Sequence, residues 1–112
     1  MNPKLYEAYY ALGRLYFIEE NYEQSIYNLN KALKDNTLKG MSEYTLAQNY
    51  IKLEELEKAV EHLERAVKED TTYLIKAKQN KDFDIISLEL SRLEDENKEL
   101  ETVTYDLTQN LE

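Results

Sequence analysis

The chain has 112 residues, no cysteine and a net charge of -9. Without cysteine it cannot form disulfides or thiolate metal sites, and its negative charge opposes binding to the phosphate backbone of nucleic acids. No apolar run approaches the roughly 20 residues that a membrane-spanning helix needs, and the first residues do not form a hydrophobic signal segment. We therefore expect one cytoplasmic domain with no nucleic-acid or membrane partner.

Only two glycines and one proline interrupt the sequence, which favours an all-α fold of long helices over many short strands. The first helix is expected to begin after Asn2, whose side chain suits the N-cap position, with Pro3 as the first helical residue. Apolar residues at spacings of three and four then form one face of this helix, which is predicted to end near Glu20. That face consists of Leu5, Ala8, Tyr9, Leu12 and Tyr16.

A second helix is predicted to follow Asn21 and to end at about Asp35. Asn21 suits the N-cap position, and Gln24 three residues later completes a capping-box pattern. The apolar face of this helix consists of Tyr22, Ile26, Leu29 and Leu33. The two helices are expected to form a hairpin, because packing the two apolar faces together removes both from water.

The sequence of this hairpin occurs twice. Repeat 1, at about 6–39, aligns without a gap with repeat 2, at about 40–73, and nine positions are identical. The alignment predicts a second hairpin with helices over residues 39–53 and 55–69. Small residues occupy matching places in the two repeats, which would allow neighbouring helices to approach closely. These small residues are Gly13, Ala32, Ala47 and Ala66.

The 34-residue period and two motifs within it resemble the tetratricopeptide repeat, a helix-turn-helix unit. The first motif is Leu-(Gly/Ala)-x-x-Tyr at residues 12–16 and 46–50. The second motif is a small residue followed by Leu and then Ala, at residues 25–32 and 59–66. The resemblance implies an α-α superhelix of two full hairpins that serves as a scaffold for binding other proteins.

In tetratricopeptide proteins the first helix of each repeat lines a concave surface that holds the partner. Chaperone-binding members of the family hold a carboxylate there with Lys and Asn. This chain has other residues at the comparable positions, so a chaperone tail is not expected as the partner. The groove residues that the resemblance implies are Tyr10, Arg14, Phe17, Tyr44, Gln48 and Ile51. The alternative is that these side chains pack against the third unit of the chain.

The period breaks after Asp70. Aligning Phe83 with Leu56 preserves the apolar pattern of a second repeat helix, but the offset is 27 residues instead of 34. We therefore expect a degenerate third unit, with a short helix over residues 72–79, a turn, and a long helix that begins at Phe83. The two parts of the chain are then a repeat region, 1–82, and a C-terminal helix, 83–112.

The predicted C-terminal helix carries an apolar stripe with a heptad period. Its first part, residues 85–93, is expected to cap the open face of repeat 2, and its distal part is free to pair with another helix. A parallel homodimer is disfavoured, because Glu96 and Glu101 would face each other with like charge across the seam. The residues assigned to oligomerisation are Leu93, Asn97, Leu100, Leu107 and Leu111.

No catalytic or metal site is expected. His62 is the single histidine, and without cysteine or a second histidine it cannot build an ordinary zinc site, so we expect it to be a surface residue. No nucleophile motif or calcium loop occurs either. The sequence thus predicts a non-enzymatic scaffold, without a cofactor, that binds a peptide or a partner helix through its concave face. The alternative is a self-assembly module that dimerises through the C-terminal helix.

Overall fold

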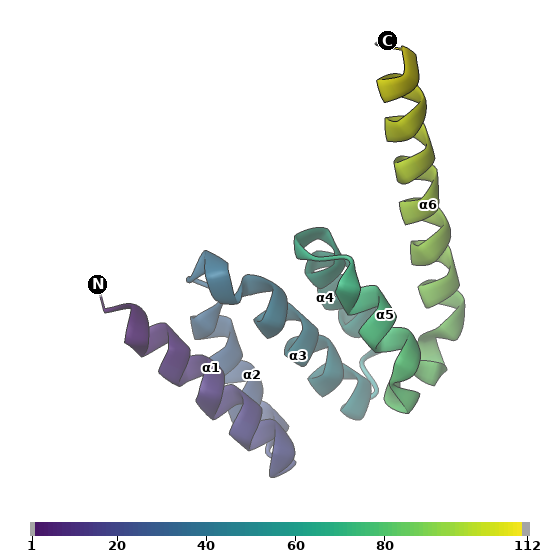
Figure 1. The fold of residues 1–112 in the computed structure, drawn as a ribbon. Helices are drawn as coiled ribbons and strands as arrows, with labels where there is room; N and C mark the ends of the chain where they lie inside the picture. The colour runs from purple at the N-terminus through teal and green to yellow at the C-terminus, as the bar shows by residue number, and fades with distance from the viewer. Residues whose placement is uncertain (1, 111–112) are drawn as a thin grey trace.

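The computed structural model describes the backbone of residues 2–110 and the side chains of residues 2 and 4–98. These residues form six α-helices and two short 3₁₀ helices, with no strand among them (Figure 1). In chain order the elements are α1 (Pro3–Ile18), α2 (Tyr22–Ala32), η1 (Asn36–Leu38), α3 (Lys39–Lys52), α4 (Leu56–Glu69), α5 (Thr72–Gln79), η2 (Lys81–Ile86) and α6 (Ser87–Asn110). The prediction of an all-α fold is confirmed.

The helices are arranged as two consecutive hairpins followed by a shorter third unit. Helix α1 packs against α2 and α3 against α4, and α2 also contacts α3, which joins the two hairpins. Figure 1 shows α1, α3 and α5 side by side, with α2 and α4 behind them. The first helix of every unit therefore lies in one layer, and this layer carries the candidate site.

Two helices begin at the predicted N-cap residues, but Gln24 does not complete the predicted capping box, because the backbone N–H of Asn21 donates to the Tyr16 carbonyl. The side chain of Asn2 accepts a hydrogen bond from the backbone N–H of Lys4 at 3.0 Å, and that of Asn21 accepts one from Gln24 at 3.4 Å. Each bond satisfies one of the backbone donors that a helix leaves free at its N-terminus. The capping residues thus fix where α1 and α2 begin.

The two repeats approach closely where small residues were predicted. A methyl group added at Gly13 would lie 2.6 Å from Cγ of Leu29, a residue that is completely buried. Ala32, Ala47 and Ala66 have no exposed surface. Close approach of the helices at these positions is what allows the large residues around them to interdigitate.

A polar chain also links repeat 1 to repeat 2. The hydroxyl of Ser25 in α2 donates to the backbone carbonyl of Gly13 in α1 at 2.7 Å. The amide nitrogen of Asn49 in α3 donates to the Ser25 oxygen at 3.0 Å. All three residues are buried, so these hydrogen bonds fix the hairpins relative to one another in a setting without competing water.

The turn between the two helices of each repeat contains a glutamate with positive φ. Glu20 has a φ of 63° and Glu54, one period later, a φ of 60°. The backbone N–H of Glu20 donates to the Phe17 carbonyl and that of Asn21 to the Tyr16 carbonyl, which is the Schellman pattern at a helix C-terminus. Glutamate is unusual there because its Cβ is strained in the left-handed conformation.

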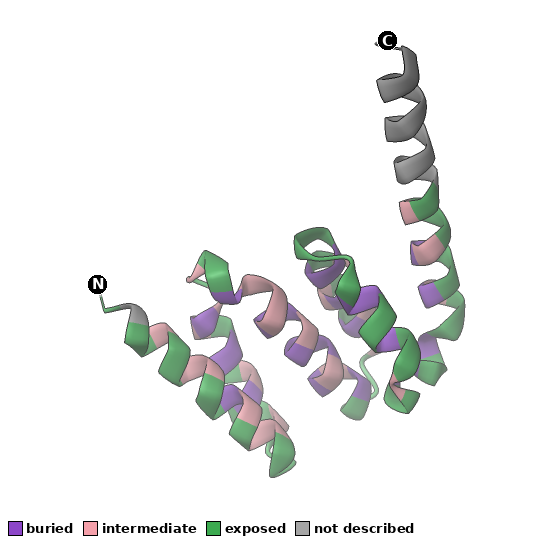
Figure 2. Cartoon of the chain, viewed as in Figure 1, coloured by how far each residue is buried: buried purple, intermediate pink, exposed green. Residues whose placement is uncertain are grey.

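The core is concentrated in repeat 2 and the third unit (Figure 2). Its largest completely buried members there include Leu46, Leu63 and Phe83. In contrast, Leu5 and Leu12 of α1, predicted to lie on one apolar face, are both exposed. Among the described elements α1 packs mainly against α2, with few contacts to α3 and η1, so much of its surface remains exposed.

The third unit begins as predicted and then departs from the prediction. Helix α5 covers Thr72–Gln79, but the long helix begins at Ser87 instead of Phe83. The side chain of Asn80 accepts a hydrogen bond from the backbone N–H of Asp82 at 3.0 Å, and residues 81–86 wind as the 3₁₀ helix η2. The turns predicted to begin the α-helix are therefore a 3₁₀ helix, with the Asn80 side chain capping its start.

The first turns of α6 cover the end of repeat 2. Leu90 and Leu93 of α6, and Ile86 at the end of η2, are buried in the core. Arg92 pairs with Glu64 of α4 at 3.0 Å, and Lys78 of α5 pairs with Glu94. Within the described residues, no helix combines the length and the hydropathy that crossing a bilayer requires.

Candidate functional site

The candidate site is a cavity of about 340 Å³ on the layer formed by α1, α3 and α5. Each of these helices contributes side chains to it. Four of the six groove residues that the family resemblance implies line it, together with four others. The lining residues are Tyr10, Arg14, Met41, Tyr44, Thr45, Gln48, Tyr73 and Lys76.

The helical period explains why the predicted residues meet. Tyr10 and Arg14 are four residues apart on α1, and Tyr44 and Gln48 are four residues apart on α3, so each pair occupies one helix face. Tyr44 follows Tyr10 by the 34-residue period. Because equivalent helices pack in the same orientation, the two faces lie on the same side of the layer.

Two predicted groove residues do not line this cavity. The ring of Phe17 packs against that of Tyr22 with centroids 5.9 Å apart, within the turn of repeat 1. Ile51 is buried in the core together with residues of α4. Both lie one turn beyond the lining residues of their helices, so the cavity occupies only part of the expected groove.

The sequence did not reveal the contribution of α5. Tyr73 and Lys76 line the cavity from the third unit, where the repeat period is lost and no register identifies groove positions. The only sequence feature that pointed to them is that an aromatic and a basic residue lie three apart on a predicted helix and so share one face. This feature predicts a place in the cavity only when α5 is known to pack beside α3.

Tyrosine rings form the apolar part of the cavity wall. The ring of Tyr44 lies between that of Tyr73, with centroids 5.3 Å apart, and that of Phe83, at 5.5 Å. Burial raises the pKa of the Tyr44 hydroxyl, and this effect outweighs the opposing hydrogen bond with the Asn80 side chain and the positive charge of Arg14. Burial also raises the pKa of Tyr73. Both hydroxyl groups therefore stay protonated at neutral pH and can donate hydrogen bonds.

The charged groups of the cavity wall are both cationic. Arg14 and Lys76 line the cavity, and no carboxylate does. The Nζ atom of Lys76 lies 4.9 Å from the centre of the Tyr73 ring, which is within the range of a cation–π contact. Among the described residues, neither cation forms an ion pair. Two carboxylates lie near the cavity without lining it, since Asp82 and Asp70 add to the effect of burial in raising the pKa of Tyr44 and of Tyr73. Only the charged side chains that line the cavity are all positive.

His62 was predicted to be a surface residue, and this prediction is wrong. Its Nδ1 atom is 2.5 Å from a carboxylate oxygen of Glu43, a buried residue of α3, and its ring stacks on Tyr50 with centroids 5.2 Å apart. The prediction failed because it considered only neighbours on the same helix. The register offered a signal, since Glu43 and His62 both replace uncharged residues of repeat 1, Tyr9 and Asn28.

This histidine has a structural role in α3–α4 packing. The pair lies between the two helices of repeat 2, outside the set of residues that line the cavity. Within residues 2 and 4–98, no group of three or more His, Asp or Glu side chains is placed to hold a metal ion.

The residues assigned to oligomerisation are only partly described. Leu93 is buried in the core of its own chain, and the amide nitrogen of Asn97 donates to the Leu93 carbonyl at 2.8 Å. The side chains of Leu100 and Leu107, and the whole of Leu111, lie outside the described residues. A heptad seam for a partner helix would therefore begin after Leu93.

The repeat structure agrees with a comparison to protein families. The model of the tetratricopeptide repeat matches residues 6–34 and 44–73, which together make up more than half of the chain. Comparisons with curated proteins and with solved structures gave no match. The two matched segments correspond to the hairpins α1–α2 and α3–α4. The chain therefore belongs to the tetratricopeptide repeat family.

Proposed function

We propose that the protein is a non-enzymatic cytoplasmic adaptor, and that it binds an extended acidic segment of a partner protein in the cavity between α1, α3 and α5. Tetratricopeptide repeats generally mediate protein–protein interactions, and proteins of the family are generally scaffolds without catalytic activity. The observation that carries the proposal is the gathering of three tyrosines and two unpaired cations around one cavity.

The tyrosines suit the binding of a peptide. Tyrosine offers a large, rigid contact area together with a hydroxyl group, and it is enriched among the residues that contribute most to protein interfaces. Tyr10 and Tyr44 present equivalent positions on neighbouring helices. A segment that crosses the layer from α1 to α5 can therefore meet one tyrosine on each helix.

The cations select the charge of the segment. The guanidinium of Arg14 can bind a carboxylate through two parallel hydrogen bonds, and the ammonium of Lys76 can add a third contact. These two groups favour Asp or Glu side chains on the segment.

The size of the cavity fits an anchoring side chain of such a segment. Its volume of about 340 Å³ lies at the lower end of the range of pockets that enclose small ligands. One or two side chains would occupy the cavity, and the rest of the segment would lie across the outer faces of the helices. Affinity then depends on a few anchors, as in most peptide interfaces.

Selection from random peptides displayed on phage tests the proposal. We expect the wild-type protein to enrich peptides rich in Asp and Glu, and the Arg14→Gln/Lys76→Gln variant to lose this enrichment. The Lys4→Gln/Lys34→Gln variant changes the net charge equally at exposed positions away from the cavity and should keep it. Enrichment of basic peptides, or equal loss in both variants, would refute the proposal.

A second candidate function is dimerisation through the distal part of α6. This helix has 24 residues, against 14 in α4, and so extends beyond the repeat it covers. Sedimentation velocity on the full chain and on a chain truncated after Glu94 tests this alternative. A concentration-dependent dimer that is lost on truncation supports it, and a monomer at all concentrations excludes it.

A further inference from the structure

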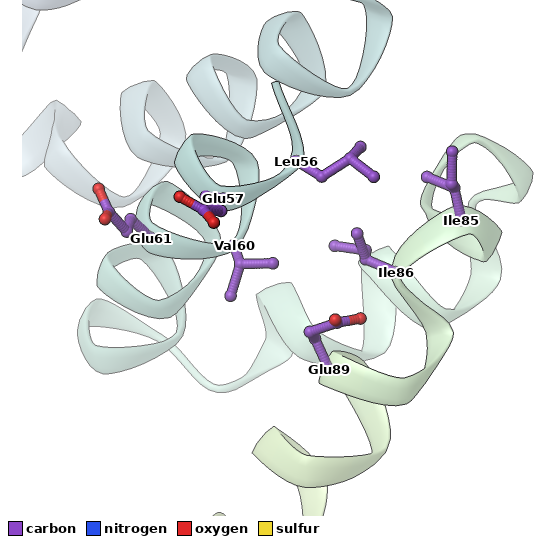
Figure 3. Close-up of a pocket in the computed structure, with 7 residues that line it drawn as sticks. All are labelled: Leu56, Glu57, Val60, Glu61, Ile85, Ile86 and Glu89. Atoms are coloured by element: carbon purple, nitrogen blue, oxygen red, sulfur yellow. The ribbon is translucent and has the colours of Figure 1, made fainter. Parts of the chain in front are cut away.

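A second groove lies on the side of α4 that faces the start of α6. Its volume is about 320 Å³, and none of its lining residues belongs to the cavity described above. Figure 3 shows Leu56 and Val60 of α4 across from Ile85 and Ile86, with a glutamate of α6 beside them. The lining residues are Leu56, Glu57, Val60, Glu61, Ile85, Ile86 and Glu89.

The groove continues into exposed apolar surface. In the 3₁₀ helix η2, Ile86 is buried beneath the groove, whereas the neighbouring Ile85 is 60% exposed at its edge. Leu88, three residues further on, is 82% exposed. An exposed isoleucine at the edge of an apolar groove, with an exposed leucine three residues further along the chain, is typical of a surface that binds a partner.

The rim of the groove is acidic and lacks countercharges. Glu57, Glu61 and Glu89 form no ion pair with any described residue, whereas Glu64 and Glu94 on the same two helices are both paired. Glu57 and Glu61 are also four residues apart on α4, where like charges destabilise a helix. Glu57 and Glu89 lie in the first turns of α4 and α6, where the helix dipole stabilises a carboxylate, but Glu61 has no such interaction within the described residues.

One basic residue of α4 lies close to this rim along the helix. Arg65 is four residues after Glu61, a spacing that favours an ion pair. Its guanidinium lies 3.4 Å from Nδ1 of His62 instead, and that nitrogen already donates to the Glu43 carboxylate. Within the described residues Glu61 thus has no ion-pair partner.

We propose that this groove binds a basic amphipathic helix of a partner protein. Such a helix presents apolar residues along one face, which would cover Leu56, Val60 and Ile85, and it carries lysine or arginine beside that face. Those cations would pair with the three glutamates of the rim. A helix fits because the groove runs between two helices, where a third can pack by interdigitation of side chains.

Charge favours this occupant over a second copy of the chain. Each copy carries a net charge of -9, so two copies repel one another at long range. A basic helix is attracted by the same field. The groove and the cavity between α1, α3 and α5 thus select partners of opposite charge, and the adaptor would hold two different segments at once.

Fluorescence anisotropy with a defined probe tests the inference. The probe is a labelled synthetic peptide of leucine, alanine and lysine, with leucine at positions i, i+3, i+4 and i+7. We expect the full-length protein to bind it, with affinity that falls as salt concentration rises. A peptide of the same composition in scrambled order, and one with glutamate in place of lysine, should bind at least about tenfold more weakly.

Two pairs of variants locate the binding. Glu57→Gln/Glu61→Gln/Glu89→Gln should weaken binding about tenfold, whereas Glu7→Gln/Glu19→Gln/Glu23→Gln, with the same change of charge at exposed positions of repeat 1, should leave it within about twofold. Ile85→Ser should also weaken it. Ile18→Ser replaces a similarly exposed residue, 68% exposed, and should have no effect.

The inference would be wrong if both triple variants weakened binding equally or if the scrambled peptide bound as well as the original. It would also be wrong if the Ile85→Ser variant bound the peptide fully. A dimer in sedimentation that Ile85→Ser abolishes would contradict it as well. The last result would identify a second copy as the occupant. Arg14→Gln/Lys76→Gln should bind the basic peptide normally, so failure at this groove and failure at the tyrosine-lined cavity can be told apart.

Discussion

The ring of Tyr44, in the tyrosine-lined cavity between α1, α3 and α5, stacks on the completely buried ring of Phe83. Their centroids are 5.5 Å apart and their planes lie at 19°. Phe83 belongs to the third unit, whose sequence no longer follows the repeat. The least regular part of the chain thus holds a central residue of the candidate site in place. This contact connects the packing of the third unit to binding at the cavity.

Replacement of Phe83 should therefore affect both stability and binding. Phe83→Leu keeps an apolar side chain but removes the ring, and we expect it to lower the free energy of unfolding by about 1–2 kcal/mol. Because Tyr44 loses the surface on which it stacks, affinity for acidic peptides should fall as well. Urea denaturation and peptide titration measure the two effects.

Phe17→Leu is the matched control for this prediction. Phe17 is half-buried against Tyr22 and lies outside the cavity. Its replacement should cost some stability and leave peptide affinity unchanged. If both leucine variants weakened binding equally, the stacking of Tyr44 on Phe83 would have no special role.

Glycine in place of Glu54, in the turn between α3 and α4, should increase the stability of the protein. Glu54 has a φ of 60°, and the left-handed conformation costs a residue with a Cβ about 1–2 kcal/mol. Glycine avoids this strain but gains about 0.5–1 kcal/mol of entropy in the unfolded chain. Glu54→Gly should therefore stabilise the protein by about 0.5–1 kcal/mol, measured as a higher urea midpoint. Glu19→Gly, at a φ of -79°, should give no such gain; a gain of similar size there would show that strain at Glu54 is not the cause.

The buried pair of Glu43 and His62 should stabilise repeat 2. His62→Ala leaves the Glu43 carboxyl group buried without its partner, and we expect a loss of about 2–3 kcal/mol in the free energy of unfolding. The double variant Glu43→Tyr/His62→Asn installs the corresponding residues of repeat 1 and should lose less than His62→Ala does. A double variant less stable than the single one would contradict this explanation.

The steric cost of adding a methyl group at Gly13 should exceed the gain in helix propensity. Alanine in a helix interior is favoured over glycine by about 1 kcal/mol, yet its methyl group would lie 2.6 Å from the Leu29 side chain. Gly13→Ala should therefore destabilise the protein by about 1–3 kcal/mol in urea denaturation. In a Leu29→Ala background the clash is gone, and the same change should become neutral or stabilising. An equal cost in both backgrounds would exclude Leu29 as its source.

The sequence was informative where a local pattern determines the structure. The 34-residue period placed α1 to α4 within a few residues, because capping residues and apolar spacing act within one helix. The same register brought Tyr10 and Tyr44 into one cavity. The family resemblance pointed to these positions, and the period explains why they meet, because equivalent residues of stacked repeats lie on the same side of the layer.

The features that were missed depend on contacts between elements. The pairing of Glu43 with His62 joins two helices, and pattern reasoning along either helix does not show it. Tyr73 and Lys76 belong to a unit without register, so their place in the cavity follows only from the packing of α5. Helix α6 starts at Ser87 because residues 81–86 form a 3₁₀ helix, and the apolar spacing of these residues does not distinguish the two kinds of helix.

The most direct test of the proposed function is an NMR titration of the full-length protein with an acidic peptide selected from the phage display. We expect the backbone amide shifts to change around Tyr10, Arg14, Tyr44 and Gln48, and to extend to Tyr73 and Lys76 of α5. The residues of the acidic groove between α4 and α6 should not respond. Shifts confined to α2, α4 or α6, with α1, α3 and α5 unchanged, would contradict binding at the tyrosine-lined cavity.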